Sequence, residues 1–172
     1  TGVPGSPAGQ VQQIQEFSSA GLAGVWAAQN TREAIWDAMQ RKETFATSGP
    51  MMKVRFFGSF DYAADDVAKP DFLKLAYGKG VPMGGDLKPG AGNAPTFLVS
   101  ALKDPKSGNL DRIQIVKGWL DAEGKQHEKI HDVAWSGDRA IGADGKLPAV
   151  GDSVDLTTAT YTDAIGAAEL AT

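Results

Sequence analysis

The sequence has no cysteine, which excludes a disulfide, a thiolate metal site and a cysteine nucleophile. Its only histidines are His127 and His131. No apolar stretch approaches the roughly 20 residues of a membrane-spanning helix, so we expect no membrane span. The net charge is −4 and no block of basic residues occurs, which argues against a nucleic-acid partner. The missing cysteine fits both cytoplasm and periplasm and favours neither.

What remains is an ordinary globular composition. Of the 172 residues, 42% are hydrophobic and 22% charged, as in average globular proteins. This length leaves room for one domain, or for a small domain plus a fragment of another. It excludes a complete (β/α)₈ barrel, which takes about 250 residues. The chain begins at Thr1 without a basic and apolar signal sequence. We therefore expect a piece processed or excised from a longer polypeptide.

The first 49 residues have the pattern of an α/β segment. A helix is predicted over residues 7–20, and a short buried strand over 22–26. A second helix is predicted to begin at Asn30, because Asn30 and Glu33 have the spacing of a capping box. Its apolar face contains Ile35, Ala38 and Met39, and it should end near Lys42.

After residues 48–50 the pattern changes to short strands separated by turns. Residues 70–77 predict a short helix, and the proline in residues 80–85 limits that segment to a turn or an edge strand. Alternation of apolar and polar residues predicts a strand over 52–57, and Ile113 and Ile115 share one face of a strand predicted over 112–120. Further strands are predicted over 96–102, 128–135 and 153–158. We therefore predict an α+β chain, with a short α/β tail over 1–49 followed by a mainly antiparallel β-sandwich over 50–172.

The segment from His127 to His131 matches the H-E-x-x-H pattern of zinc hydrolases. On a helix both imidazoles would bind one zinc ion, with Glu128 as the general base. The turn residues 121–124 favour a hairpin instead, and on a strand four residues span about 13 Å. We therefore expect a solvent-facing hairpin, and a metal site at His127, Glu128 and His131 only if this segment is helical.

An acidic loop contains Asp61, Asp65 and Asp66. It lacks the alternating ligand spacing of an EF-hand loop, so we predict a solvated turn rather than a calcium site.

Two tryptophans, Trp119 and Trp135, flank the predicted hairpin and are expected to face each other across it. Aromatic residues more often pack in cores than bind ligands. Buried rings would favour a scaffolding role here, and exposed rings would favour recognition of a carbohydrate or a partner.

Several long motifs run in order from about Val11 to the end of the chain. They are Gly24-Val-Trp-Ala, Asn30-Thr-Arg-Glu-Ala-Ile-Trp-Asp-Ala-Met, Arg41-Lys-Glu-Thr-Phe-Ala-Thr-Ser-Gly-Pro, Val54-Arg-Phe-Phe-Gly, Gly80-Val-Pro-Met-Gly-Gly-Asp, Leu110-Asp-Arg-Ile-Gln-Ile-Val-Lys-Gly-Trp, Asp132-Val-Ala-Trp-Ser-Gly and Ile165-Gly-Ala-Ala-Glu-Leu. In these motifs the chain resembles the C-terminal part of DUF3604, a bacterial family of uncharacterised function.

Complete members of that family are several times longer and resemble PHP-type metal-dependent hydrolases, which carry their metal motifs in an upstream α/β barrel. The resemblance implies that residues 1–49 are the tail of this catalytic domain and include its closing helix. Residues 50–172 would form the accessory β-sandwich. The family continues with further strand sequence, so we expect this sandwich to lack a C-terminal strand and to have an open edge.

The metal-ligand motifs of PHP-like proteins have no counterpart in this sequence, so no catalytic, cofactor-binding or metal residue is transferred. We expect a divalent metal in the upstream domain and none in this chain. The sequence thus predicts an accessory, non-catalytic fragment of a metal-dependent, phosphoesterase-like hydrolase, whose partner is the remainder of its own polypeptide. The alternatives are a non-enzymatic β-sandwich that binds a ligand or partner, and the H-E-x-x-H zinc hydrolase.

Overall fold

The computed structural model describes residues 21–88, 92 and 94–172; the helix predicted over 7–20 lies outside them. Antiparallel strands dominate, which confirms the α+β, sandwich-like prediction. The elements, in chain order, are β1 (Leu22–Val25), α2 (Arg32–Gln40), β2 (Thr44–Thr47), β3 (Lys53–Ser59), the 3₁₀ turn η1 (Asp66–Ala68), α3 (Phe72–Lys79), β4 (Val81–Pro82), β5 (Thr96–Leu102), β6 (Arg112–Leu120), β7 (Gln126–Trp135), β8 (Val154–Asp155), β9 (Thr160–Tyr161) and β10 (Glu169–Ala171).

The first described unit is an antiparallel pair, β1 and β2, with α2 between them in the chain. Helix α2 begins one residue later than predicted. Its N-cap is Thr31, whose side chain accepts a hydrogen bond from the Ala34 amide at 3.3 Å. Asn30 is therefore not the cap. Both residue types suit this position, and the hydrogen bond to the N3 amide decides which one occupies it.

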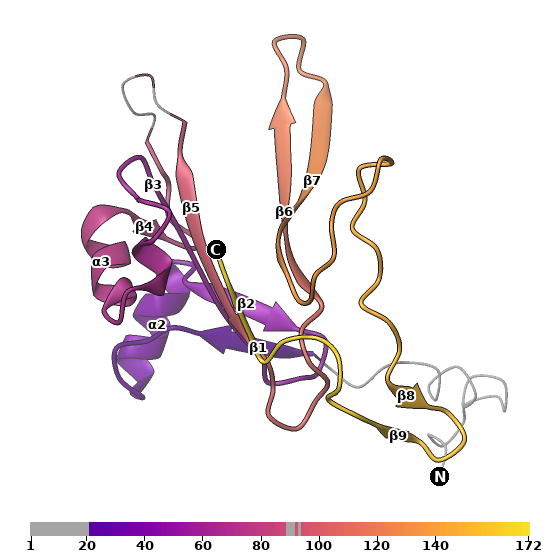
Figure 1. Ribbon diagram of the computed structural model, residues 1–172. Helices are drawn as coiled ribbons and strands as arrows, with labels where there is room; N and C mark the ends of the chain where they lie inside the picture. The colour runs from indigo at the N-terminus through magenta and orange to yellow at the C-terminus, as the bar shows by residue number, and fades with distance from the viewer. Residues whose placement is uncertain (1–20, 89–91, 93) are drawn as a thin grey trace, which may run out of the picture.

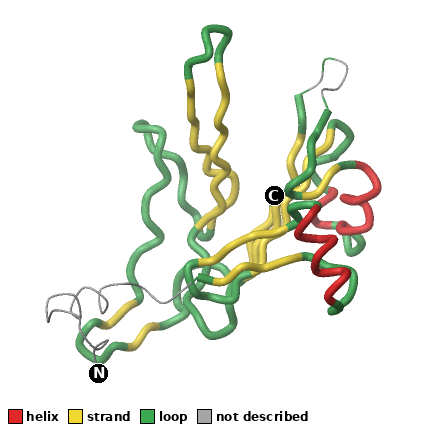
Figure 2. Tube along the Cα trace, turned by 180° about the vertical axis from the view of Figure 1, so that it is seen from behind, coloured by secondary structure: helices red, strands yellow, loops and turns green. Residues whose placement is uncertain are grey.

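The main sheet has four strands in the order β10-β5-β3-β4. Phe57 of β3 lies directly opposite Leu98 of β5, and both are buried on the face that packs against Ala76 of α3. The two helices lie together on one side of the molecule (Figure 2). This cluster is the centre of the hydrophobic core.

Strands β6 and β7 form a long hairpin that projects beside the sheet (Figure 1). The four-residue turn over 121–124 sets a register in which Trp119 lies opposite His127. A register shift near Ile113 then places Trp135 opposite Arg112. The prediction that the two tryptophans face each other is therefore wrong.

The C-terminal part of the chain has little regular structure. The strand predicted over 153–158 is reduced to β8, because the Asp155 side chain accepts hydrogen bonds from the Thr157 and Thr158 amides and starts a turn. Strand β10 returns to pair with β5 at the edge of the main sheet. Among the described residues, no helix has the length and apolar character needed to cross a membrane.

Candidate functional site

The H-E-x-x-H segment lies on strand β7. His127 pairs with Trp119 and His131 pairs with Ile115, so the two imidazoles are separated along a strand. The helix on which the zinc hypothesis depends does not form here. Within the described part of the chain, no group of three or more histidine, aspartate or glutamate side chains has the arrangement of a metal site.

At the end of the hairpin, Trp119 stacks on His127 with ring centroids 5.3 Å apart. The Lys117 ammonium lies 5.0 Å from the centroid of the Trp119 ring. His127 Nε2 is 2.7 Å from Asp121 Oδ2, and this contact, together with backbone amides of the turn, lowers the pKa of Asp121. Trp119 is 40% exposed. A shallow hollow of about 490 Å³ lies here, lined by Gly118, Trp119, Leu120, Gln126, His127 and Glu128.

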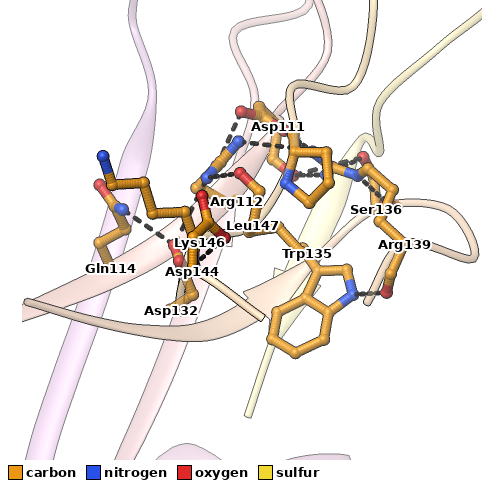
Figure 3. A network of polar contacts seen from close by, with 11 residues as sticks. Asp111, Arg112, Gln114, Asp132, Trp135, Ser136, Arg139, Asp144, Lys146 and Leu147 are labelled. Atoms are coloured by element: carbon orange, nitrogen blue, oxygen red, sulfur yellow. Dashed lines mark hydrogen bonds and ion pairs between the residues drawn. The ribbon is translucent and has the colours of Figure 1, made fainter. Parts of the chain in front are cut away.

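The base of the hairpin carries a network around Asp111 (Figure 3). Its carboxylate lies 2.8 Å from Arg112 Nε and 2.6 Å from Arg139 Nη1. Burial opposes ionisation of Asp111, but the two guanidiniums outweigh it and lower its pKa. Arg112 also donates to the Leu147 carbonyl at 3.0 Å, and both arginines donate to the Pro148 carbonyl. The network therefore ties the loop over 140–150 to the hairpin and is structural in character.

A second polar cluster joins the first 49 residues to the sheet. Glu43, whose side chain is 4% exposed, forms ion pairs with Arg41 at 3.4 Å and Arg55 at 3.6 Å. It also accepts a hydrogen bond from the Tyr77 hydroxyl. Arg55 lies 3.4 Å above the Trp26 ring. Burial and the bond to Glu43 raise the pKa of Tyr77, so its phenol remains a donor at neutral pH.

The position of Asp66 differs from the prediction of a solvated acidic turn. Its neighbours Asp61 and Asp65 are exposed, but Asp66 is fully buried rather than solvated. Its carboxylate accepts hydrogen bonds from Lys69 Nζ at 2.6 Å, Lys79 Nζ at 3.0 Å and the Ala63 amide at 2.9 Å; these partners lower its pKa. All of these partners belong to the chain itself, so the carboxylate secures the loop before α3.

The outer face of α2 is apolar and exposed. Trp36 is 59% exposed and Met39 is 53% exposed, whereas Ala38 on the inner face is buried. Ile35, Trp36 and Met39 line an open groove of about 640 Å³ together with Arg32, Glu33 and Asp37. Exposed apolar patches rimmed by charged residues commonly mark interaction surfaces.

The fold and these clusters define a β-rich α+β unit. Its polar side chains mainly secure loops, and an open groove with apolar lining lies on helix α2. The chain belongs to the DUF3604 family: the family model, described as "Protein of unknown function (DUF3604)", matches residues 4–172. Searches of curated proteins and of solved structures return no match.

Sequence reasoning found the hairpin and its histidines but missed the buried carboxylates of Glu43 and Asp66. Glu43 follows a helix and Asp66 stands in an acidic loop, and both positions are typical of solvated residues. The nearby Lys69 was the one local signal for Asp66.

Proposed function

We propose that this chain is the accessory part of a metal-dependent, phosphoesterase-like hydrolase and that α2 attaches it to the catalytic domain of the same polypeptide. The observation that carries the proposal is the exposed apolar face of α2, with Trp36 at its centre. Burying such a ring stabilises an interface by about 1.5–3 kcal/mol. The resemblance to PHP-type hydrolases supplies the hydrolytic class.

In this proposal residues 1–49 complete the catalytic domain, with α2 as its closing helix, and residues 50–172 form the accessory sandwich. The Glu43 cluster, which consists of Glu43, Arg41, Arg55 and Tyr77, would hold residues 1–49 rigidly against the sandwich. Arg55 and Tyr77 of the sandwich contact Glu43 directly. The divalent metal is assigned to the catalytic domain, because the metal-ligand motifs of PHP-like proteins have no counterpart in this sequence. No chemical step is assigned to these residues.

The test compares two substitutions in the longer polypeptide. Trp36→Glu places a charge on the proposed interface, whereas Leu156→Glu changes a side chain that is 89% exposed on a distant loop. We expect Trp36→Glu to lower both the melting temperature and the hydrolysis of a phosphate monoester with a divalent cation, and Leu156→Glu to leave both near wild type. In the 172-residue chain alone, neither change should alter the melting temperature appreciably. Wild-type behaviour of Trp36→Glu in the longer polypeptide would contradict the proposal.

A second candidate function is a non-enzymatic module that binds a ligand at the end of the hairpin. The exposed ring of Trp119 beside the hollow there favours it. In that case Trp119→Ala would abolish ligand binding, while Trp36→Glu would leave both binding and stability unchanged.

A further inference from the structure

One face of the β6–β7 hairpin is basic although the chain as a whole is acidic. Side chains alternate between the two faces of a strand, so residues 115, 117 and 119 of β6 share a face with their partners 127, 129 and 131 of β7. This face carries Lys117, Lys129, His127, His131 and Trp119, and we call it the basic hairpin face. The other face contains Glu128 and exposed apolar residues.

The two lysines are the unusual feature of this face. Lys117 and Lys129 lie directly opposite each other on the two strands, and both are exposed. Like charges in this position destabilise an antiparallel pair. Neither ammonium forms an ion pair with a carboxylate of the described residues. Within the described ranges, two neighbouring positive charges are therefore kept without a carboxylate partner.

Two histidines and a tryptophan surround the lysine pair on this face. His131 lies two residues from Lys129 on one side, and His127 lies two residues away on the other, so both imidazoles flank the lysine pair. The carboxylate of Asp121 at the end of the face is in contact with His127. The Trp119 ring stacks on His127, and the Lys117 ammonium lies 5.0 Å from its centroid, so the ring contacts both basic residues.

We propose that the basic hairpin face binds a ligand through a phosphate or pyrophosphate group, with Lys117 and Lys129 as the principal contacts. Two ammonium groups on flexible stems can both reach one such group, and hydrogen bonds between charged partners are the strong ones. Bound phosphate would also remove the repulsion between the two lysines. This inference is independent of the role proposed for α2, which involves different residues.

The test is a titration of the 172-residue chain with inorganic pyrophosphate, monitored by ¹H–¹⁵N NMR. Sodium chloride is adjusted at each point to keep the ionic strength constant. We expect saturable shifts confined to residues 115–119 and 127–131. The double variant Lys117→Gln/Lys129→Gln should weaken binding by about tenfold or more. The matched control is Lys125→Gln, which removes an exposed lysine in the turn of the same hairpin and should change the affinity by less than about twofold.

A second variant separates the loss of charge from a disturbed hairpin. Lys117→Arg/Lys129→Arg keeps both charges and should retain binding. Shifts that follow ionic strength alone, or equal shifts in the wild type and the glutamine double variant, would overturn the proposal.

Discussion

The hydroxyl of Tyr77 on α3 donates a hydrogen bond to the buried carboxylate of Glu43, which lies just after α2. Arg55 of β3 donates to the same hydroxyl at 2.9 Å and forms an ion pair with the same carboxylate. Three elements distant in sequence therefore meet at one carboxylate, and the polar groups there satisfy one another. These contacts connect the end of α2 to the main sheet and to α3.

Tyr77→Phe should destabilise the chain, because it removes the hydroxyl that Glu43 and Arg55 share. A buried acceptor that loses its donor costs about 1–3 kcal/mol. Denaturation with urea would measure the change. Tyr161→Phe is the control: Tyr161 bonds the Lys106 carbonyl at an exposed site, so its loss should cost less than about 0.5 kcal/mol. Equal effects of the two substitutions would show that the Glu43 cluster does not stabilise the fold.

Asp66 should make stability depend on pH in the acid range. Hydrogen bonds from Lys69, the Ala63 amide and Lys79 hold the pKa of Asp66 below the unfolded value of about 3.9. Its contribution is therefore complete above about pH 4 and is lost as the pH falls toward the folded pKa. Urea midpoints between pH 2 and pH 7 would show this.

The matched substitutions are Asp66→Asn and Asp65→Asn. Asp66→Asn should lower stability at pH 7 and flatten its dependence below pH 4. Asp65→Asn should leave the curve near wild type, because the Asp65 side chain is 73% exposed and pairs with Lys69 only at 3.4 Å. A wild-type acid dependence in Asp66→Asn would contradict this assignment.

Local sequence patterns were enough to predict most of the strands. The bounds of β5 and β6 agree with the predicted ranges, 96–102 and 112–120. In β6, Ile113 and Ile115 are less exposed than Gln114 and Val116, as their predicted common face requires. The predicted pairing of Trp119 with Trp135 is wrong, because the register of a hairpin depends on where its turn closes and not on residue type. Glu43 and Asp66 were missed as buried groups since Arg55, Tyr77 and Lys79 reach them only in the folded chain.

Gly84 should tolerate no side chain. Its φ is +81°, and an added Cβ would lie 2.3 Å from the Lys42 carbonyl oxygen. Gly84→Ala should therefore cost more than about 1 kcal/mol. Gly78→Ala is the opposite case, because Gly78 lies within α3 and has open space where the Cβ would be. This substitution should raise the free energy of unfolding by about 0.5–1 kcal/mol. Thermal melts of both variants would test the pair, and a stabilising Gly84→Ala would refute the predicted contact.

Arg139→Gln should loosen the loop over 140–150. Arg139 donates to the Pro148 carbonyl at 2.7 Å and to the Asp111 carbonyl at 2.8 Å, and glutamine cannot make both bonds. We expect limited proteolysis to cut this loop several times faster than in wild type. Lys146→Gln, which changes an exposed side chain in the same loop, should be cut at the wild-type rate. Equal rates of proteolysis in the two variants would show that contacts other than those of Arg139 hold the loop in place.

Hydrogen exchange would show whether α2 attaches this unit to a catalytic domain, as we propose. The amides of residues 32–40 would be compared in the 172-residue chain and in the longer polypeptide, with residues 96–102 of the main sheet as the internal reference. We predict markedly slower exchange of the α2 amides in the longer polypeptide and little change in the reference strand. Equal exchange of the α2 amides in both proteins would show that α2 is not covered by another domain.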